Sequence, residues 1–171
     1  MERCEECGYV WAIVGRDEIG PRATAAAQEI AGRLRGEPEP ARQRPADATW
    51  SALEYAAHLR DVLLTLRDRL VIGLVEDDPT FKPLYRDERV DLGLYAAETT
   101  EGTAAELEAA AAMFTRVFDA IGDDQLGRPL QFGYPPMTRS LLWLGQQVVH
   151  EAEHHRGDIE RGLLGLAGSS G

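Results

Sequence analysis

The sequence is poor in positive charge: 18 Lys and Arg residues face 29 Asp and Glu residues, which gives its 171 residues a formal net charge of −11. Proteins that bind nucleic acids or anionic lipids owe much of their affinity to clustered basic side chains. The sequence also lacks an apolar run near the ~20 residues of a membrane span, and its start lacks the layout of a secretory signal. We therefore expect no nucleic-acid partner, no membrane association and a cytoplasmic location.

Cysteine is scarce, because Cys4 and Cys7 form one Cys-x-x-Cys motif and no other cysteine follows. A zinc ribbon is excluded, since it needs two such pairs. A thioredoxin-like redox site would place the pair at the start of a helix in a βαβ unit, and the sequence shows no such unit. Three roles stay open for the pair: two free thiols on a mobile N-terminus, a disulfide switch, or half of a zinc site completed across a dimer.

Apolar residues recur every three or four positions in four long segments, a spacing that predicts helices. Two of these segments open with capping boxes, Ser51-x-x-Glu54 and Thr103-x-x-Glu106, in which each side chain can bind a free backbone N–H group. Pro21 suits the first turn of the earliest helix, because its missing N–H would have no partner there. The predicted helices cover residues 19–36, 51–75, 103–122 and 139–161.

The connection formed by residues 76–97 is far longer than the roughly two to eight residues that usually join neighbouring helices of a bundle. Such a connection can cross the bundle and let the second and third helices run parallel. Internal repeats and alternating β-branched runs are missing. We predict an all-α fold, a four-helix bundle with a long crossover between helices 2 and 3, over residues 19–163. Residues 1–18 are then an N-terminal segment and residues 164–171 a flexible C-terminal tail.

The four histidines are unevenly placed, with His58 on the second predicted helix and His150, His154 and His155 on the fourth. Because His150 and His154 are four residues apart, they lie on one face of a helix. His155 points about 100° away from them, which suits a surface position or a place behind the ligands. If the two helices touch, His58 could complete a three-histidine site. Three protein ligands plus water are typical of a catalytic metal centre.

Asp61 and Asp158 each follow a histidine by about one helical turn. They are candidate acceptors for the imidazole N–H groups that do not face a metal. Without a metal, His150 and His154 would be ordinary exposed polar residues and His58 a core histidine with one hydrogen bond. The two aspartates would then be solvated surface charges.

The string from His150 to His154 also matches H-E-x-x-H, in which zinc proteases use the glutamate as a general base. Such proteases carry a sheet upstream, whereas this chain is helical throughout by its pattern, and no methionine follows Glu160 for a Met-turn. The context therefore disfavours a protease. Glu54 and Glu151 both lie near the expected ligands, but helical spacing does not separate a base from a capping or surface carboxylate.

Two segments of the chain resemble the DinB/YfiT-like superfamily. One is the W-S-x-x-E-x-x-x-H string from Trp50 to His58, and the other is the H-x-x-x-H-H-x-x-D string from His150 to Asp158, where many members have Gln at the last position. The resemblance extends over nearly the whole chain and implies a four-helix bundle with a long crossover. It places the family's metal ligands on His58, His150 and His154. The metal in members is a divalent ion, commonly zinc or nickel.

The resemblance also implies a class of reaction. Related proteins include S-transferases that use bacillithiol or mycothiol, and an isomerase that needs mycothiol. In them a divalent cation lowers the pKa of the thiol sulfur and holds a thiolate ready to attack an electrophile. Lys82 is the only lysine beside many arginines, which indicates a GC-rich genome and favours mycothiol, the thiol of actinobacteria. We expect a metal-dependent S-transferase or isomerase that takes a small-molecule thiol and an electrophile.

A non-enzymatic role is the alternative, in which the metal-binding protein responds to stress by binding a partner or forming a dimer. Family members often form homodimers through bundle helices, so the resemblance implies a homodimer for this protein. The small residues of the run 109–112 would permit such close approach, or could pack within the chain.

Four aromatic residues are candidate pocket walls or core residues: Trp50, Phe132, Tyr134 and Trp143.

Overall fold

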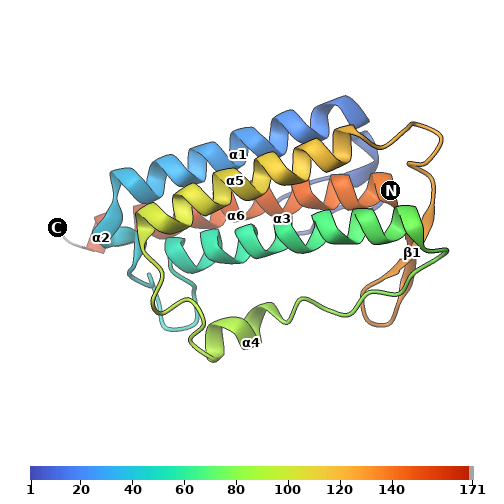
Figure 1. Ribbon diagram of the computed structural model, residues 1–171. Coiled ribbons are helices and arrows are strands. Elements are labelled where there is room, and N and C mark those ends of the chain that lie inside the picture. Colours follow the sequence, from blue (N-terminus) through green and yellow to red (C-terminus); the bar gives the residue numbers. More distant parts are fainter. Residues whose placement is uncertain (170–171) are drawn as a thin grey trace.

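Four long helices form the bundle in the computed structural model, which describes residues 1–169 of the chain (Figure 1). They are α1 (Arg16–Gly36), α3 (Ala52–Val75), α5 (Thr100–Asp119) and α6 (Leu141–Ser169). The shorter elements are η1 (Trp11–Ile13), α2 (Pro38–Ala41), α4 (Arg86–Asp91), β1 (Pro129–Phe132) and β2 (Met137–Ser140). The expected four-helix bundle is confirmed. No helix of residues 1–169 combines the length and the hydropathy that a membrane span requires.

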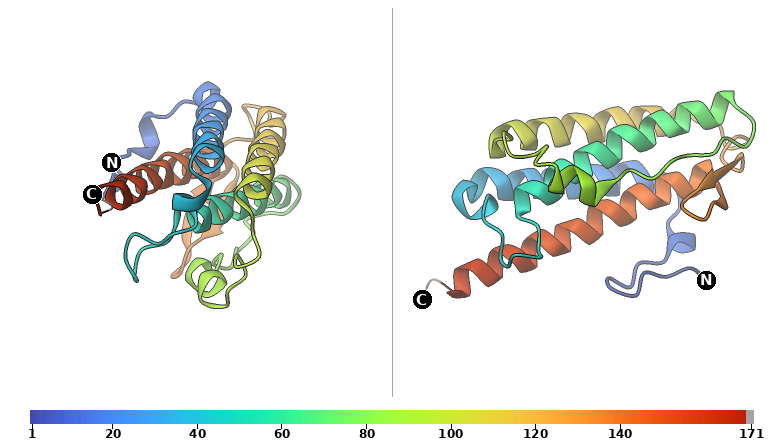
Figure 2. Two further views of the ribbon diagram at one scale, coloured as in Figure 1. Left: turned by 90° about the vertical axis from the view of Figure 1, so that its left-hand side faces the viewer. Right: turned by 90° about the horizontal axis from the view of Figure 1, so that it is seen from below.

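The connection between α3 and α5 runs back along the outside of the bundle and carries α4 (Figures 1 and 2). As a result α3 and α5 point in the same direction, and α1 and α6 point in the opposite one. The predicted crossover between the second and third long helices is therefore confirmed. Its physical basis is the length of the connection, which is sufficient to return from one end of the bundle to the other.

One of the two predicted capping boxes is present. The backbone N–H of Ser51 donates to Glu54 Oε2 at 2.8 Å, and the N–H of Glu54 donates to Ser51 Oγ at 3.2 Å. The second box is wrong, because α5 begins a turn earlier with Thr99 as its N-cap. Thr103 lies inside the helix, where its hydroxyl donates to Glu98 Oε2 at 3.0 Å.

The first helix also begins earlier than predicted. The backbone N–H of Gly15 donates to Glu18 Oε2 at 2.9 Å, so the helix starts at Arg16 and Pro21 lies inside it instead of in its first turn. A carboxylate in the first turn satisfies a backbone N–H that has no partner within the helix.

The last helix begins later and ends later than predicted. Residues 137–140, predicted as helix from 139, form β2 and pair with β1 in an antiparallel hairpin, so α6 starts at Leu141. At its other end α6 continues to Ser169, and residues 164–169, expected in a flexible tail, are helical. Residues 170–171 of that expected tail lie outside the described part of the chain.

The core lies between the long helices, and Phe114 and Phe118 of α5 are fully buried within it. Ala110 and Ala111 are each 1% exposed, so half of the small-residue run packs inside the bundle. The helix α6 reaches the same core through Gly145. A Cβ atom at Gly145 would clash with the ring of Phe118 and would lie 2.8 Å from Cδ1 of Ile19. Close approach of α6 to α1 and α5 thus depends on the missing side chain.

The segment before α1 packs along α6 (Figure 2). The hydroxyl of Tyr9 donates to the backbone oxygen of Gln146 at 2.8 Å, and the indole N–H of Trp11 donates to Gln147 Oε1 at 2.8 Å. Tyr9 and Trp11 are 9% and 8% exposed, so their rings belong to the core. These contacts bring the Cys-x-x-Cys motif to the surface of α6.

Candidate metal centre

Two interleaved pairs of side chains on α6 point in different directions, because successive residues of an α-helix are rotated by about 100°. Glu151 and His155 form the first pair and face α3, where Glu151 approaches His58. His150 and His154 form the second pair and face the N-terminal segment, where the ring of His150 lies 4.6 Å from that of Trp11 between centroids.

The group facing α3 is compact. One oxygen of Glu151 lies 3.2 Å from His155 Nε2 and 3.7 Å from His58 Nε2. Candidate ligand atoms of all three side chains lie within 4.8 Å of one another. The side chains of His58, Glu151 and His155 are 2%, 18% and 6% exposed. Two imidazoles and one carboxylate at this separation are ligand types that zinc and similar divalent ions take.

The nitrogens of this group lack partners that their burial would otherwise demand. Both ring nitrogens of His58 are buried without a hydrogen-bond partner among residues 1–169, and Nε2 of His155 makes no hydrogen bond of suitable geometry, although it lies beside the Glu151 carboxylate. A buried polar atom left unpaired costs about 1–3 kcal/mol. On the other side of its ring, His155 Nδ1 lies 2.9 Å from Asp158 Oδ2. A proton shared there leaves the Nε2 lone pair directed at Glu151, as in carboxylate–histidine–metal arrangements. The residues therefore fit a divalent cation.

The charges within the group favour a cation. Burial disfavours the charged form of Glu151, but the neighbouring His155 and His58 outweigh it and hold the pKa of its carboxyl below the ordinary value. Burial likewise lowers the pKa of His155, but the carboxylates of Asp158 and Glu151 raise it by more. The negative field that keeps a proton on His155 equally stabilises a divalent metal ion at its Nε2.

The structure does not bring the expected set of His58, His150 and His154 into one group. His58 is grouped instead with Glu151 and His155. These two residues directly follow His150 and His154 on α6. Both pairs have the same spacing of four residues, so the helical pattern fits either, and only the rotation of α6 against α3 separates them. Accordingly His155 is buried at 5% exposure, instead of lying at the surface.

The two aspartates have different environments. Asp61 does not face His58, because its carboxylate accepts hydrogen bonds from Arg89 Nη1 at 2.7 Å and from the hydroxyl of Tyr95 at 2.9 Å. Asp158 does lie beside the histidines: its Oδ2 is 2.9 Å from His155 Nδ1 and 3.5 Å from His154 Nε2. Of the two candidate acceptors, the structure places only Asp158 next to imidazole nitrogens.

A cavity of about 480 Å³ adjoins this group. It lies between α3, the segment before and within α4, and the turn of the β1–β2 hairpin, and His58 and Glu151 form part of its wall. Phe132 and Tyr134 also line it, as expected for pocket walls. Its volume falls in the range of about 300–1,000 Å³ typical of small-molecule sites.

The other two aromatic candidates lie outside this cavity. The ring of Trp50 contacts that of His58 at 5.5 Å between centroids and lines a smaller hollow of about 240 Å³. Trp143 packs edge-on against Phe132 at 5.0 Å between centroids.

Two of the open alternatives for glutamates are resolved by contacts. Glu54 caps α3 and pairs with Arg44, so it does not face the group. Glu151 directs Oε2 toward His58 and His155, whereas its Oε1 accepts a hydrogen bond from Gln147 and lies 4.0 Å from His150 Nδ1. The only strands among residues 1–169 are the short pair β1 and β2. A zinc-protease arrangement, with its metal between His150 and His154 and the glutamate as base, finds no counterpart here.

Comparison with known proteins agrees with this architecture. The model of the DinB superfamily matches residues 22–159, which include α3, the crossover and the α6 residues described above. The chain belongs to the DinB superfamily. No curated protein shows significant similarity to it in sequence.

Two solved structures share the DinB-superfamily fold of this chain. YfiT from Bacillus subtilis, described as a probable metal-dependent hydrolase with an unusual four-helix bundle topology, superposes with a TM-score of 0.71 at 17% identity, over 94% of this chain and 90% of that protein. A mutant of the mycothiol-dependent maleylpyruvate isomerase superposes with a TM-score of 0.68 at 13% identity, over 88% of this chain and 63% of that protein.

Proposed function

We propose that this DinB-superfamily protein is a metal-dependent enzyme that uses a low-molecular-weight thiol such as mycothiol, as an S-transferase or an isomerase. The observation that carries the proposal is the buried group of His58, Glu151 and His155 with unpaired nitrogens at the wall of a 480 Å³ cavity. Three protein ligands, which leave coordination positions for a substrate or water, are typical of catalytic centres. The mycothiol-dependent isomerase with the same fold supports the choice of thiol.

In this proposal one set of residues binds the metal ion and another set lines the cavity that binds the reactants. His58, Glu151 and His155 would hold a divalent cation, zinc or nickel, whose charge lowers the pKa of a thiol and makes a thiolate available for attack. Glu151 Oε1 accepts a hydrogen bond from Gln147 Nε2 at 2.7 Å, which fixes the carboxylate in its orientation. Phe132 supplies apolar wall and excludes water from the cavity side.

The test is a thiol-transfer assay on the metal-loaded protein. Mycothiol is offered with a panel of activated alkenes, epoxides and alkyl halides, and thiol consumption and product mass are measured. We expect a product that needs both thiol and metal. Glu151→Gln is expected to reduce the rate at least about 100-fold, because it removes the anionic ligand. Glu160→Gln is the matched control on the same helix, since Glu160 is exposed and outside the cavity.

Two outcomes would contradict the proposal. Metal-dependent turnover that proceeds without any thiol would identify a hydrolase. A metal-loaded protein inert toward every thiol and electrophile would favour the non-enzymatic role.

A separate prediction concerns Arg69, a cation in the cavity wall. Arg69 is 8% exposed, and burial lowers the pKa of its guanidinium. It donates to the backbone oxygen of Lys82 and lies 5.2 Å from the ring centroids of Phe81 and Phe132, and no carboxylate pairs with it among residues 1–169. A buried guanidinium without a counterion is suited to bind a carboxylate of the substrate.

We therefore expect Arg69→Gln to raise the KM for carboxylate-bearing electrophiles about 10- to 100-fold, the equivalent of one charged hydrogen bond. The KM for matched amide analogues should change little. Arg67→Gln is the control, since Arg67 pairs with Asp68 outside the cavity. Equal losses for the acid and the amide would show that Arg69 only supports the fold.

A further inference from the structure

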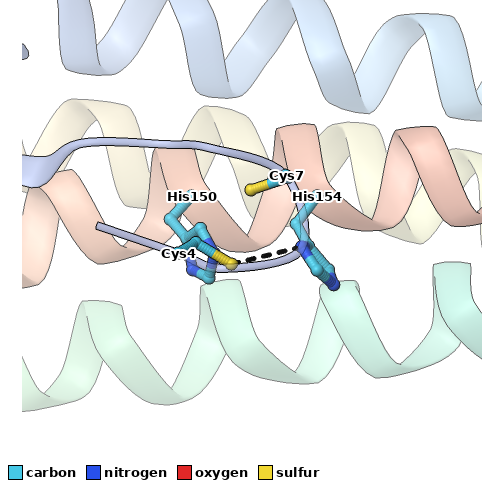
Figure 3. A group of neighbouring side chains, drawn as sticks. All are labelled: Cys4, Cys7, His150 and His154. Carbon is cyan, nitrogen blue, oxygen red and sulfur yellow. Dashed lines mark hydrogen bonds between the residues drawn. The ribbon is translucent and has the colours of Figure 1, made fainter.

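The second group of potential ligands on α6 lies outside the centre described above. Figure 3 shows the side chains of Cys4 and Cys7, on the N-terminal loop, gathered with those of His150 and His154 on α6. Candidate ligand atoms of all four lie within 4.8 Å of one another, and Cys4 Sγ is 4.0 Å from His154 Nδ1. Ligands of a tetrahedral zinc ion are about 3.3–3.8 Å apart, so the group needs little contraction to hold one.

The loop is shaped to present both sulfurs to the helix. The backbone N–H of Cys4 donates to the oxygen of Tyr9 at 2.8 Å, and the N–H of Gly8 donates to the oxygen of Cys4 at 2.9 Å. Gly8 has a φ of 75°, a conformation that residues with a side chain rarely adopt. These bonds close a turn around Cys7, and the bonds of Tyr9 and Trp11 to α6 hold that turn in place.

His150 provides an independent indication of a ligand. Both of its ring nitrogens are buried and have no hydrogen-bond partner among residues 1–169. Its ring contacts those of Tyr9 and Trp11, with centroid distances of 5.2 Å and 4.6 Å, and its side chain is only 12% exposed. An imidazole in an apolar setting without a partner is a costly arrangement, unless one nitrogen binds an ion.

His154 has the orientation of a metal ligand. Its Nδ1 faces Cys4, and its Nε2 lies 3.2 Å from Glu6 Oε2 and 3.5 Å from Asp158 Oδ2. Metal-binding histidines commonly donate their second ring N–H to a carboxylate, which fixes the tautomer. Both carboxylates also add negative charge, which would stabilise a cation bound beside His154.

We propose that Cys4, Cys7, His150 and His154 bind a second metal ion, a structural zinc, that fastens the N-terminal segment to α6. Two thiolates and two imidazoles in tetrahedral arrangement select zinc among the common divalent ions. The spacings Cys-x2-Cys and His-x3-His are those of structural zinc sites, and four protein ligands leave no position for a substrate. On binding, each cysteine releases its thiol proton to solvent. This site is distinct from the centre of His58, Glu151 and His155 and does not depend on its activity.

The test measures zinc per chain in the untagged, reduced full-length protein by mass spectrometry. We expect about two zinc ions in the wild type and about one in Cys4→Ser and in Cys7→Ser. The matched variant Glu151→Gln should also contain about one ion. In this variant the retained ion is the one at the cysteine site, and the ion lost is the one at the centre of His58, Glu151 and His155. Circular dichroism checks that each variant stays helical.

Replacing zinc with cobalt reports directly on which atoms bind the metal, and the wild-type protein alone already gives the decisive spectrum. The wild type and Glu151→Gln should show a thiolate-to-cobalt charge-transfer band and the intense visible absorption of tetrahedral cobalt. Cys4→Ser should lose the charge-transfer band. The proposal is overturned if the cobalt protein shows no such band, or if zinc content does not change on substitution of either cysteine. A single ion retained in Cys4→Ser but lost in both His58→Ala and His150→Ala would also overturn it, in favour of one three-histidine site. A Cys4–Cys7 disulfide in the freshly purified protein would be a fourth contrary result.

Discussion

Replacing His155 with alanine is expected to weaken divalent-metal binding at the centre beside the cavity by at least about 100-fold, whereas replacing His154 should leave that binding nearly unchanged. The reason is the rotation of α6, which directs His155 Nε2 to within 3.2 Å of Glu151 and places His154 on the face toward Cys4. Replacing a residue that hydrogen-bonds to a metal ligand typically lowers the metal affinity roughly 10- to 100-fold, and replacing a ligand itself should lower it further.

The measurement is zinc affinity by competition with a chromophoric chelator. The background carries Cys4→Ser and Cys7→Ser, so that binding through thiolates does not contribute. His155→Ala and His154→Ala are then a matched pair, because they remove the same side chain from adjacent positions of one helix. If His154→Ala removed the metal and His155→Ala did not, the ligand register predicted from the sequence would be restored, and the grouping with Glu151 would be wrong.

Substituting Gly145 with valine is expected to lower the free energy of unfolding by about 3 kcal/mol, the upper end of the usual cost of overpacking a core. The new side chain would collide with the buried ring of Phe118 and with Ile19, and neither α5 nor α1 can move away without opening the bundle. For a chain of this length the melting temperature should fall by roughly 6–12 °C.

Gly32→Val is the control, because Gly32 is exposed in the interior of α1 and a Cβ atom there would meet no neighbouring residue within 4 Å. It should change stability by less than about 0.5 kcal/mol. Combining Gly145→Val with Phe118→Leu should recover part of the loss, since the smaller side chain frees space. Additive effects of the two substitutions would show that the close approach of α6 to Phe118 is not what limits the size of residue 145.

The helices could be predicted from the sequence because each buries one apolar face, and the crossover could be predicted from the length of its connection. The exact ends of the helices were harder to predict from the sequence. Thr99 and Gly15 initiate helices through local contacts that compete with equally plausible caps nearby, so Thr103 and Pro21 were misplaced by about a turn. The hairpin of β1 and β2 is too short to show an alternating pattern.

The metal centre shows a different limit. The sequence identifies His58 and the short stretch of α6 that contains the other proposed ligands. The string from His150 to His155 contains two pairs four residues apart, offset by one position, and helical spacing treats them alike. Only the packing of α6 against α3 decides that Glu151 and His155 face His58. The proposed zinc site of Cys4 and Cys7 with His150 and His154 could not be predicted, because it depends on where the N-terminal segment packs against α6.

The parallel course of α3 and α5 also governs how the chain reaches its native state. α1 packs most extensively against α5, although α2, α3 and α4 all separate the two helices in sequence. In an up-and-down bundle each helix finds its partner in the next one, and such local contacts allow folding in microseconds to milliseconds. Here a long loop must close before α1 gains its main neighbour. The barrier to folding should therefore be set by chain topology more than by the stability of any single helix.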